Sequence, residues 1–286
     1  MAGPIVDHIA KIKDGNRFVI PENSRHRACV VCAGATEIAP YCTVDALAYV
    51  QCRQCGLVYV DRLATDEAMR GAYTGGVIRK LRRRLMAPFR KLHHHKHFEQ
   101  SMERARRIYA FASSCVSGNG GNVRFLDIGC NRGYLLAAAI ERGARVFGIE
   151  LVREIMLPFL NTYPALRDRI YSEKLSQVAP RLQSGSFGLI TAIDVVEHFE
   201  NPAEDMRTIH RLLKDGGVAV LQTPDAGCEQ AKVTGSAWGA LKPLEHLHLF
   251  NRENFVMFAR TIGFHTAETY EPFEHADGNF VAVLKK

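Results

Sequence analysis

One stretch, VRFLDIGCNRGYLL at residues 123–136, constrains the fold of this chain more than any other. Its first apolar run ends at Asp127, and the turn Gly-Cys-Asn-Arg-Gly separates it from a second apolar run with helical spacing. Gly129 and Gly133 can adopt the positive φ of a sharp turn, and Asn131 tolerates a positive φ better than most residues. The stretch therefore predicts a buried strand that leads through a tight turn, close to a bound ligand, into a helix.

Strand and helix patterns alternate from this stretch to the last residue. The predicted strands cover 123–129, 145–150, 169–172, 187–194, 217–223, 264–270 and 279–285. The predicted helices cover 133–142, 151–161, 202–213 and 251–262. Such alternation predicts an α/β fold: a Rossmann-like, doubly wound, mostly parallel sheet with helices on both faces. The short connection at 271–278 predicts that the last two strands form an antiparallel hairpin at the sheet edge.

The 286 residues are enough for one large domain and a small module. The segment SGNGGN at 117–122 is a predicted flexible joint before the α/β domain. We therefore predict an N-terminal module at 1–64, a basic helical linker or lid at 65–120, and the α/β domain at 121–286. Pro88 is expected to interrupt the helices of the linker.

The basic charge of the chain is concentrated in this linker. Residues 77–107 hold eleven lysines and arginines against Glu99 and Glu103, a larger surplus than the net charge of +7 for the whole chain. Three interpretations remain open: a solvated helical lid, a site for a phosphorylated small substrate, or a surface for nucleic acid. Aromatic residues are sparse among these cations, which disfavours the third.

Two Cys-x-x-Cys pairs dominate the N-terminal module. Cys29 and Cys32 form the first pair, Cys52 and Cys55 form the second, and 19 residues separate the pairs. This spacing is typical of a zinc ribbon, in which four thiolates surround the metal in a closed tetrahedron. We predict a structural zinc site, since four protein ligands leave no position for a reactive water. The alternative, two redox-active dithiols, lacks the βαβ context of such sites.

A second carboxylate indicates the class of ligand at the turn. Glu150 ends the predicted strand at 145–150, about 20 residues after the turn, where a carboxylate can accept hydrogen bonds from both hydroxyls of a ribose. The turn and Glu150 together favour a bound nucleoside over an ordinary turn with Glu150 in solvent. The turn does not match the dinucleotide fingerprint G-x-G-x-x-G.

Several segments in a fixed order resemble class I S-adenosylmethionine-dependent methyltransferases. The turn LDIGCNRG is similar to motif one of that family, and FGLITAIDVVEHFENP (187–202) and LLKDGGVAVLQTP (212–224) are similar to its fourth and fifth strands. EHLHLFNRENFVMFARTIGF (245–264) resembles the late helix of the branch that contains ubiquinone-pathway O-methyltransferases. The resemblance covers residues 123–286 and departs from the motif at Asn131, where the family has glycine.

The resemblance implies a set of cofactor-binding residues. They are Asp127, Gly129, Cys130, Asn131, Gly133, Glu150 and Asp194. Within this set, Asp127 and the glycines would hold the methionine part of S-adenosylmethionine, Glu150 the ribose, and Asp194 the amine. Residues 172–175 would approach the adenine.

Carboxylates and histidines are expected to meet at the same edge of the sheet. Glu197 and His198 follow a predicted strand, and His246 comes from a later loop. In one mechanism His198 or His246 is the general base that deprotonates an acceptor hydroxyl. In another, Asp194 joins them to ligate a divalent metal such as Mg²⁺. A structural alternative is that Glu197 and His198 cap the next helix and steady the loop. Trp238 is expected either to wall the acceptor pocket or to anchor its own loop.

The N-terminal cysteine module resembles that of sugar methyltransferases of antibiotic and surface-polysaccharide pathways, on the segment CRQCGLVYVD. We therefore predict O-methylation of a small acceptor, sugar-like or phosphorylated. The alternatives are an RNA methyltransferase that holds RNA with the module and the basic helices, and a non-catalytic interaction protein that has kept the cofactor fold.

The chain lacks the apolar run of about 18 residues that a membrane-spanning helix needs. Its first residues include Asp7, Lys11 and Lys13 without a long apolar stretch, so we expect no signal peptide and a cytoplasmic location.

Overall fold

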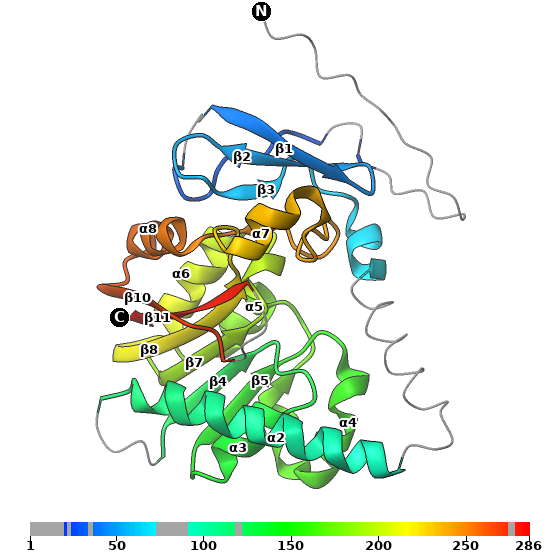
Figure 1. The fold of residues 1–286 in the computed structure, drawn as a ribbon. Helices are drawn as coiled ribbons and strands as arrows, with labels where there is room; N and C mark the ends of the chain where they lie inside the picture. Colours follow the sequence, from blue (N-terminus) through cyan, green and yellow to red (C-terminus); the bar gives the residue numbers. More distant parts are fainter. Residues whose placement is uncertain (1–19, 22–23, 34–36, 73–90, 118–121, 274–277) are drawn as a thin grey trace, which may run out of the picture.

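The computed structural model describes residues 20–21, 24–33, 37–72, 91–117, 122–273 and 278–286 (Figure 1). Two sheets organise this part of the chain, one with four strands and one with seven. The predicted break at Pro88 and most of the basic cluster lie outside the described residues. Within the described ranges, no helix has both the length and the apolar character needed to cross a membrane.

The seven-stranded sheet has the order β10-β11-β8-β7-β4-β5-β6. Neighbouring strands from β6 to β8 are parallel, whereas β11 is antiparallel to both β8 and β10. The bounds are β4 (Arg124–Ile128), β5 (Arg145–Ile149), β6 (Ile170–Tyr171), β7 (Phe187–Ile193), β8 (Leu213–Pro224), β10 (Thr266–Tyr270) and β11 (Asn279–Lys285). The predicted mostly parallel sheet with an antiparallel edge is confirmed. Its strand order reverses beside β4, which is where such sheets bind ligands.

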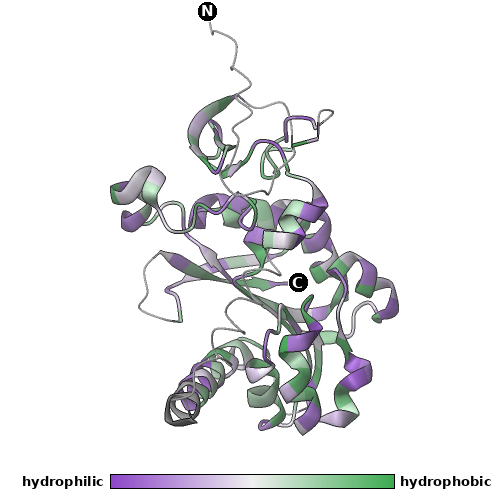
Figure 2. Cartoon of the chain, turned by 90° about the vertical axis from the view of Figure 1, so that its right-hand side faces the viewer, coloured by the Kyte–Doolittle hydropathy of each residue, from purple (hydrophilic) through white to green (hydrophobic). Residues whose placement is uncertain are grey.

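Helices cover both faces of this sheet (Figure 1). Helices α2, α3 and α4 pack on one face through residues such as Ile108 and Met156, and α5, α6 and α8 pack on the other through residues such as Ile209 and Phe258. Figure 2 shows hydrophobic residues gathered in the central strands. The bounds are α2 (Lys91–Ser114), α3 (Tyr134–Ile140), α4 (Arg153–Thr162), α5 (Leu175–Val178), α6 (Pro202–Leu212), α7 (Glu229–Thr234) and α8 (Arg252–Ile262).

The four-stranded sheet joins the cysteine segment to the large domain. Strands β1 (Ile38–Val44), β2 (Leu47–Cys52) and β3 (Val58–Val60) are antiparallel neighbours, and β9 (His248–Leu249) pairs with β3. The sheet therefore takes its fourth strand from the part of the chain that we assigned to the α/β domain. The domain boundary near residue 64 stays a prediction.

The turn after β4 has the backbone that its glycines predict. Gly129 and Gly133 have φ values of 75° and 78°, and Asn131 has φ of 49°, so this asparagine takes the positive φ that we expected of it. The amides of Gly129 and Cys130 both donate to the carbonyl of Ile149 at the end of β5, at 2.8 and 3.0 Å. The turn is thereby fixed beside the neighbouring strand.

Gly133→Ala should destabilise the fold by more than the cost of about 1–3 kcal/mol that is typical of a residue held in an unfavourable backbone region, because its Cβ also clashes with a neighbouring side chain. A Cβ at Gly133 would lie 2.6 Å from the ring of Phe159 in α4. Gly143→Ala is the matched control, because Gly143 has the same φ of 78° and open space around its Cβ position. Urea unfolding should show the larger loss for Gly133→Ala. Equal losses would mean that Phe159 moves aside at no cost.

Candidate functional site

A cavity of about 1410 Å³ opens at the carboxyl ends of the parallel strands. Strand ends form one wall, helix α2 contributes Arg104 and Ile108, and the segment 238–246 closes a third side. The predicted site residues that line it are Asp127, Gly129, Cys130, Asn131, Glu150, Asp194, Glu197, His198 and His246. Gly133 is not among the lining residues. It belongs to the same turn but packs against Phe159. The segment 172–175, expected near an adenine, does not line the cavity either.

Glu150 lies at the end of β5, as predicted, and is buried. Its carboxylate accepts hydrogen bonds from the amides of Asn131 (3.0 Å) and Val152 (2.9 Å). Burial raises the pKa of Glu150, and these backbone donors partly oppose the rise. The carboxylate therefore holds the turn in place and still faces the cavity. The Cys130 thiol, in contrast, contacts the Met156 sulfur at 3.8 Å, so the buried thiol belongs to the core.

Asp127 and Asp194 are held by different partners. Asp127 is buried and accepts from the Thr191 hydroxyl at 2.7 Å, and burial raises its pKa to about 7. Asp194 has a φ of 58° and accepts from the side-chain amides of Gln222 and Asn279, each at 3.0 Å. These amide partners were not foreseen, because nothing in the sequence distinguishes Gln222 and Asn279 from the other polar residues of β8 and β11.

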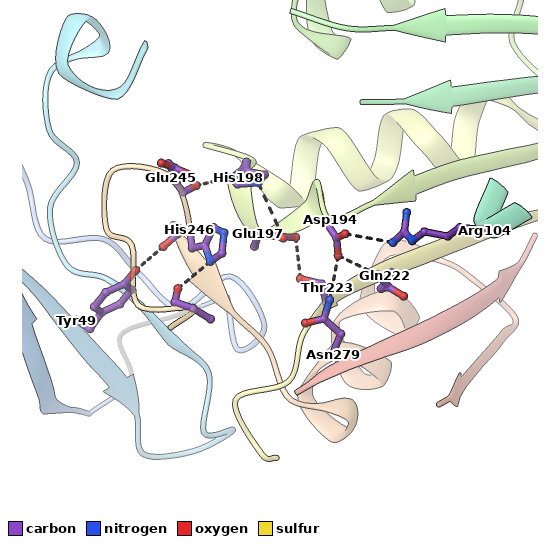
Figure 3. Close-up of polar contacts among 11 residues, drawn as sticks. Tyr49, Arg104, Asp194, Glu197, His198, Gln222, Thr223, Glu245, His246 and Asn279 are labelled. Carbon is purple, nitrogen blue, oxygen red and sulfur yellow. Dashed lines mark hydrogen bonds and ion pairs between the residues drawn. The ribbon is translucent and has the colours of Figure 1, made fainter. Parts of the chain in front are cut away.

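Arg104 is a third residue that the sequence did not single out. Its guanidinium comes from α2 and lies 3.9 Å from the Asp194 carboxylate (Figure 3). In the sequence Arg104 is one cation among many in the basic linker, so no spacing distinguishes it. In the structure it places a positive charge in the wall of the cavity.

Glu197, His198 and His246 converge, and their ligand atoms lie within 4.8 Å of one another (Figure 3). Glu197 is buried and accepts from the Thr223 hydroxyl at 2.9 Å, and burial raises its pKa to about 7. The His198 Nε2 lies 3.9 Å from the Glu197 carboxylate. Asp194, which we expected as a fourth metal ligand, is not in this cluster of described residues.

Both histidines of the cluster are oriented by backbone carbonyls. His198 Nδ1 donates to the carbonyl of Glu245 at 2.6 Å, and His246 Nδ1 donates to that of Ala240 at 2.7 Å. In the neutral rings each Nε2 is then a proton acceptor. Burial lowers the pKa of His246 to about 3, so this imidazole stays neutral at physiological pH.

The structural alternative holds in part: the bonds of His198 to Glu245 and of Leu247 to Glu197 steady the loop, but Glu197 does not cap the next helix. Its carboxylate bonds to Thr223 on β8 rather than to the first turn of α6. His248 is a structural residue, buried in the core with its Nε2 2.9 Å from the Arg27 guanidinium. Trp238 lines the cavity and also packs in the core beneath the small sheet; its role as a wall of an acceptor pocket stays a prediction.

The four cysteines meet in a second cluster, away from the cavity. Their sulfurs lie within 4.8 Å of one another, with Cys29–Cys55 at 3.5 Å and Cys32–Cys52 at 3.8 Å. A tetrahedral zinc with Zn–S bonds of about 2.3 Å places sulfurs about 3.8 Å apart. Each pair forms a tight knuckle: the Ala33 amide bonds to the Cys29 carbonyl and the Gly56 amide to the Cys52 carbonyl. The geometry fits a closed four-sulfur metal site.

The thiols of the cysteine cluster are poorly ionised in the absence of a cation. Burial, the largest cause, raises the pKa of Cys32 to about 11 and also raises that of Cys55. Four thiolates this close together need a bound cation to remain ionised.

Comparison with known proteins agrees with this geometry. The model of a family described as "Methyltransferase domain" matches residues 29–269. A ubiquinone biosynthesis O-methyltransferase of Pseudomonas aeruginosa is 35% identical over 105 residues, covering 35% of this chain and 44% of that protein. The enzyme of the same name from Leptothrix cholodnii is 31% identical over 108 residues, covering 37% and 46%. The chain thus spans less than half the length of these curated relatives.

A solved structure shares the fold. The crystal structure of a SAM-dependent methyltransferase from Archaeoglobus fulgidus has a TM-score of 0.50 and 16% identity, and the match covers 66% of this chain and 94% of that one. At this identity the likeness concerns the fold alone. The family match, in contrast, runs from the first cysteine pair through the turn at Gly129 to the last helix. This chain therefore belongs to the methyltransferase-domain family, and its resemblance to class I S-adenosylmethionine-dependent methyltransferases is confirmed.

Proposed function

We propose that this protein transfers a methyl group from S-adenosylmethionine to an oxygen atom of a small-molecule acceptor. One observation carries the proposal: a single cavity contains both the strand-end carboxylate Glu150 and the cluster of Glu197, His198 and His246. A cofactor held at the first and an acceptor held at the second would lie in the same cavity, as an in-line displacement requires.

The residues around the turn fit this cofactor. A Cβ at Gly129 would clash with the Val195 side chain, so packing as well as the positive φ requires glycine in this turn beside the cavity. Buried Asp127 and Glu150 both have raised pKa values, and a cationic ligand beside them would relieve the cost of their ionisation. S-adenosylmethionine, when bound, supplies the electrophilic methyl group on its sulfonium. In our proposal Glu150 accepts from the ribose, and Asp127 and Asp194 lie toward the methionine part.

His198 is our candidate for the general base. Its Nδ1 is held by the Glu245 carbonyl, so its Nε2 can take the proton of an acceptor hydroxyl. The Glu197 carboxylate, 3.9 Å away, would stabilise the imidazolium that forms. His246 is too weak a base for this role, since its pKa is about 3, but it can orient the hydroxyl as a hydrogen-bond acceptor.

The cluster could also hold a metal that acidifies the acceptor hydroxyl. Two imidazole nitrogens and one carboxylate make a nitrogen-rich set. Mg²⁺ prefers oxygen ligands. This donor set therefore does not favour the Mg²⁺ ion that we considered from the sequence. We retain His198 as the general base in the proposal.

The finer features of the proposal concern the acceptor, the cysteine cluster and the compartment. We propose a sugar-like or phosphorylated acceptor, supported by Arg104 and Lys242 in the cavity wall and by the sugar-methyltransferase-like cysteine module. We propose structural zinc at the four cysteines. A cytoplasmic setting is consistent with this zinc, because it keeps thiols reduced.

The deciding experiment supplies methyl-labelled S-adenosylmethionine to the protein and a cell extract, and then counts label in small-molecule, RNA and protein fractions. Label in small molecules supports the proposal, and mass spectrometry of the labelled peak identifies the acceptor. Label in RNA would replace it with the RNA methyltransferase alternative. Absence of label together with absence of cofactor binding would favour the non-catalytic alternative.

Glu150→Gln should weaken the binding of S-adenosylmethionine by about 1 kcal/mol or more, the order expected when a charged hydrogen-bond partner is lost. Isothermal titration calorimetry measures this change. Glu141→Gln is the control, since Glu141 is exposed on the surface and pairs with Arg106. If the two variants bind the cofactor equally well, Glu150 does not contact the ribose.

Turnover at saturating cofactor should rise as the pH passes through about 7, the pKa to which burial raises Glu197. Below that pH Glu197 is protonated and cannot stabilise the His198 imidazolium, and above it the carboxylate is ionised. Glu197→Gln should lower the rate and remove this rise. Asp205→Asn is the control, because burial also raises the pKa of Asp205 to about 7 but Asp205 lies on α6, outside the cavity lining. A similar pH profile in wild type and Glu197→Gln would refute the role of Glu197.

The purified protein should contain about one zinc per chain, and Cys52→Ser should lose it, because a closed tetrahedral site needs all four thiolates. Cys42→Ser is the control, since Cys42 belongs to the same segment but not to the cluster. Metal content is read by atomic emission spectroscopy. Equal zinc in wild type and Cys52→Ser would contradict the assignment.

A further inference from the structure

The cysteine module and the acceptor side of the cavity share one short segment of backbone. His246 precedes strand β9, and β9 is the strand that completes the module's sheet by pairing with β3. Tyr59 of β3 lies opposite His248, and Val58 lies opposite Leu249. His246 thus lies two residues before a strand that pairs with the cysteine module.

Leu247 connects the module to Glu197 through its backbone. Its carbonyl accepts from the amide of Val60 in β3 at 3.0 Å, and its amide donates to the carbonyl of Glu197 at 2.7 Å. The backbone carbonyl of Leu247 therefore binds the cysteine module, and its backbone amide binds Glu197. A shift of β3 would be transmitted to Glu197 without passing through a flexible side chain.

Tyr49 makes the most direct contact from the module to the site. Its ring is buried in the core beneath the small sheet, and its hydroxyl donates to the carbonyl of His246 at 2.7 Å (Figure 3). On the opposite side, His246 is held by the bond from its Nδ1 to the Ala240 carbonyl. These two hydrogen bonds fix both the backbone and the ring of His246.

We propose that Tyr49 is a positioning residue for methyl transfer, through which the cysteine module holds His246 in register with Glu197. The inference rests on the proposed function, and it gives the module a part in turnover beyond folding. Cofactor binding should not depend on this contact, because the turn at Gly129 and the end of β5 are fixed by their own hydrogen bonds.

Tyr49→Phe removes one hydroxyl and leaves the His246 carbonyl without that buried donor. We expect kcat to fall by about tenfold to a hundredfold, since small misplacements of catalytic groups have effects of this size. The affinity for S-adenosylmethionine should stay within about twofold by calorimetry. Tyr59→Phe is a matched control: Tyr59 is equally buried in the same sheet, and its hydroxyl has no hydrogen-bond partner in the described structure, so kcat should be unchanged.

A double-mutant cycle separates positioning from a general loss of stability. If Tyr49 acts through His246, Tyr49→Phe should cost nothing further in a His246→Ala background. An equal loss in both backgrounds would overturn the proposal, and so would a kcat for Tyr49→Phe that matches that of Tyr59→Phe. Should Tyr49→Phe fail to fold, Arg27→Gln tests the same coupling at the contact with His248.

Hydrogen exchange provides a test that does not require turnover. In Tyr49→Phe the amides of residues 245–249 should exchange faster than in wild type, while those of 128–133 stay protected. Unchanged exchange at 245–249 would overturn the inference even if the enzyme is active. Faster exchange in a protein that methylates nothing would leave the coupling standing and reject the proposed function instead.

Discussion

Three buried carboxylates around one cavity set the electrostatics on which the rest of the site depends. Asp127, Glu150 and Glu197 are each nearly inaccessible to solvent, and the hydrogen bonds that hold them come from hydroxyls and backbone amides. Such partners only partly offset the cost of burying a negative charge, so all three pKa values are raised. A cavity built in this way favours ligands that bring positive charge, and a sulfonium cofactor with an ammonium group has that property.

The parts of this structure that could be predicted from the sequence are those specified by neighbouring residues. Strand β4 with Asp127, the left-handed turn at Asn131 and the cysteine knuckles are each encoded within a few positions. The carboxyl ends of parallel strands lie at the same edge of a sheet. Glu150 and Glu197, which follow two such strands, could therefore be expected at that edge.

The parts that could not be predicted depend on contacts between distant segments. Strand β9 has two residues, too few to show a period, and its pairing with β3 is decided by the packing of both segments. Tyr49 and Arg104 are ordinary members of an apolar strand and a basic helix until the fold carries them to the cavity. For the same reason the position of the cysteine module could be predicted from the sequence, whereas its attachment to the large domain through β9 could not.

The pairing of β3 with β9 also has a consequence for synthesis of the chain. The Tyr49 hydroxyl and its carbonyl partner are 197 positions apart, so the module leaves the ribosome long before its last strand exists. Before β9 is synthesised, the edge of β3 that will pair with it has unpaired backbone groups. Such an edge can pair with the strands of other chains. A metal ion bound by the two knuckles at this stage would keep the nascent module compact until β9 is synthesised and pairs with β3.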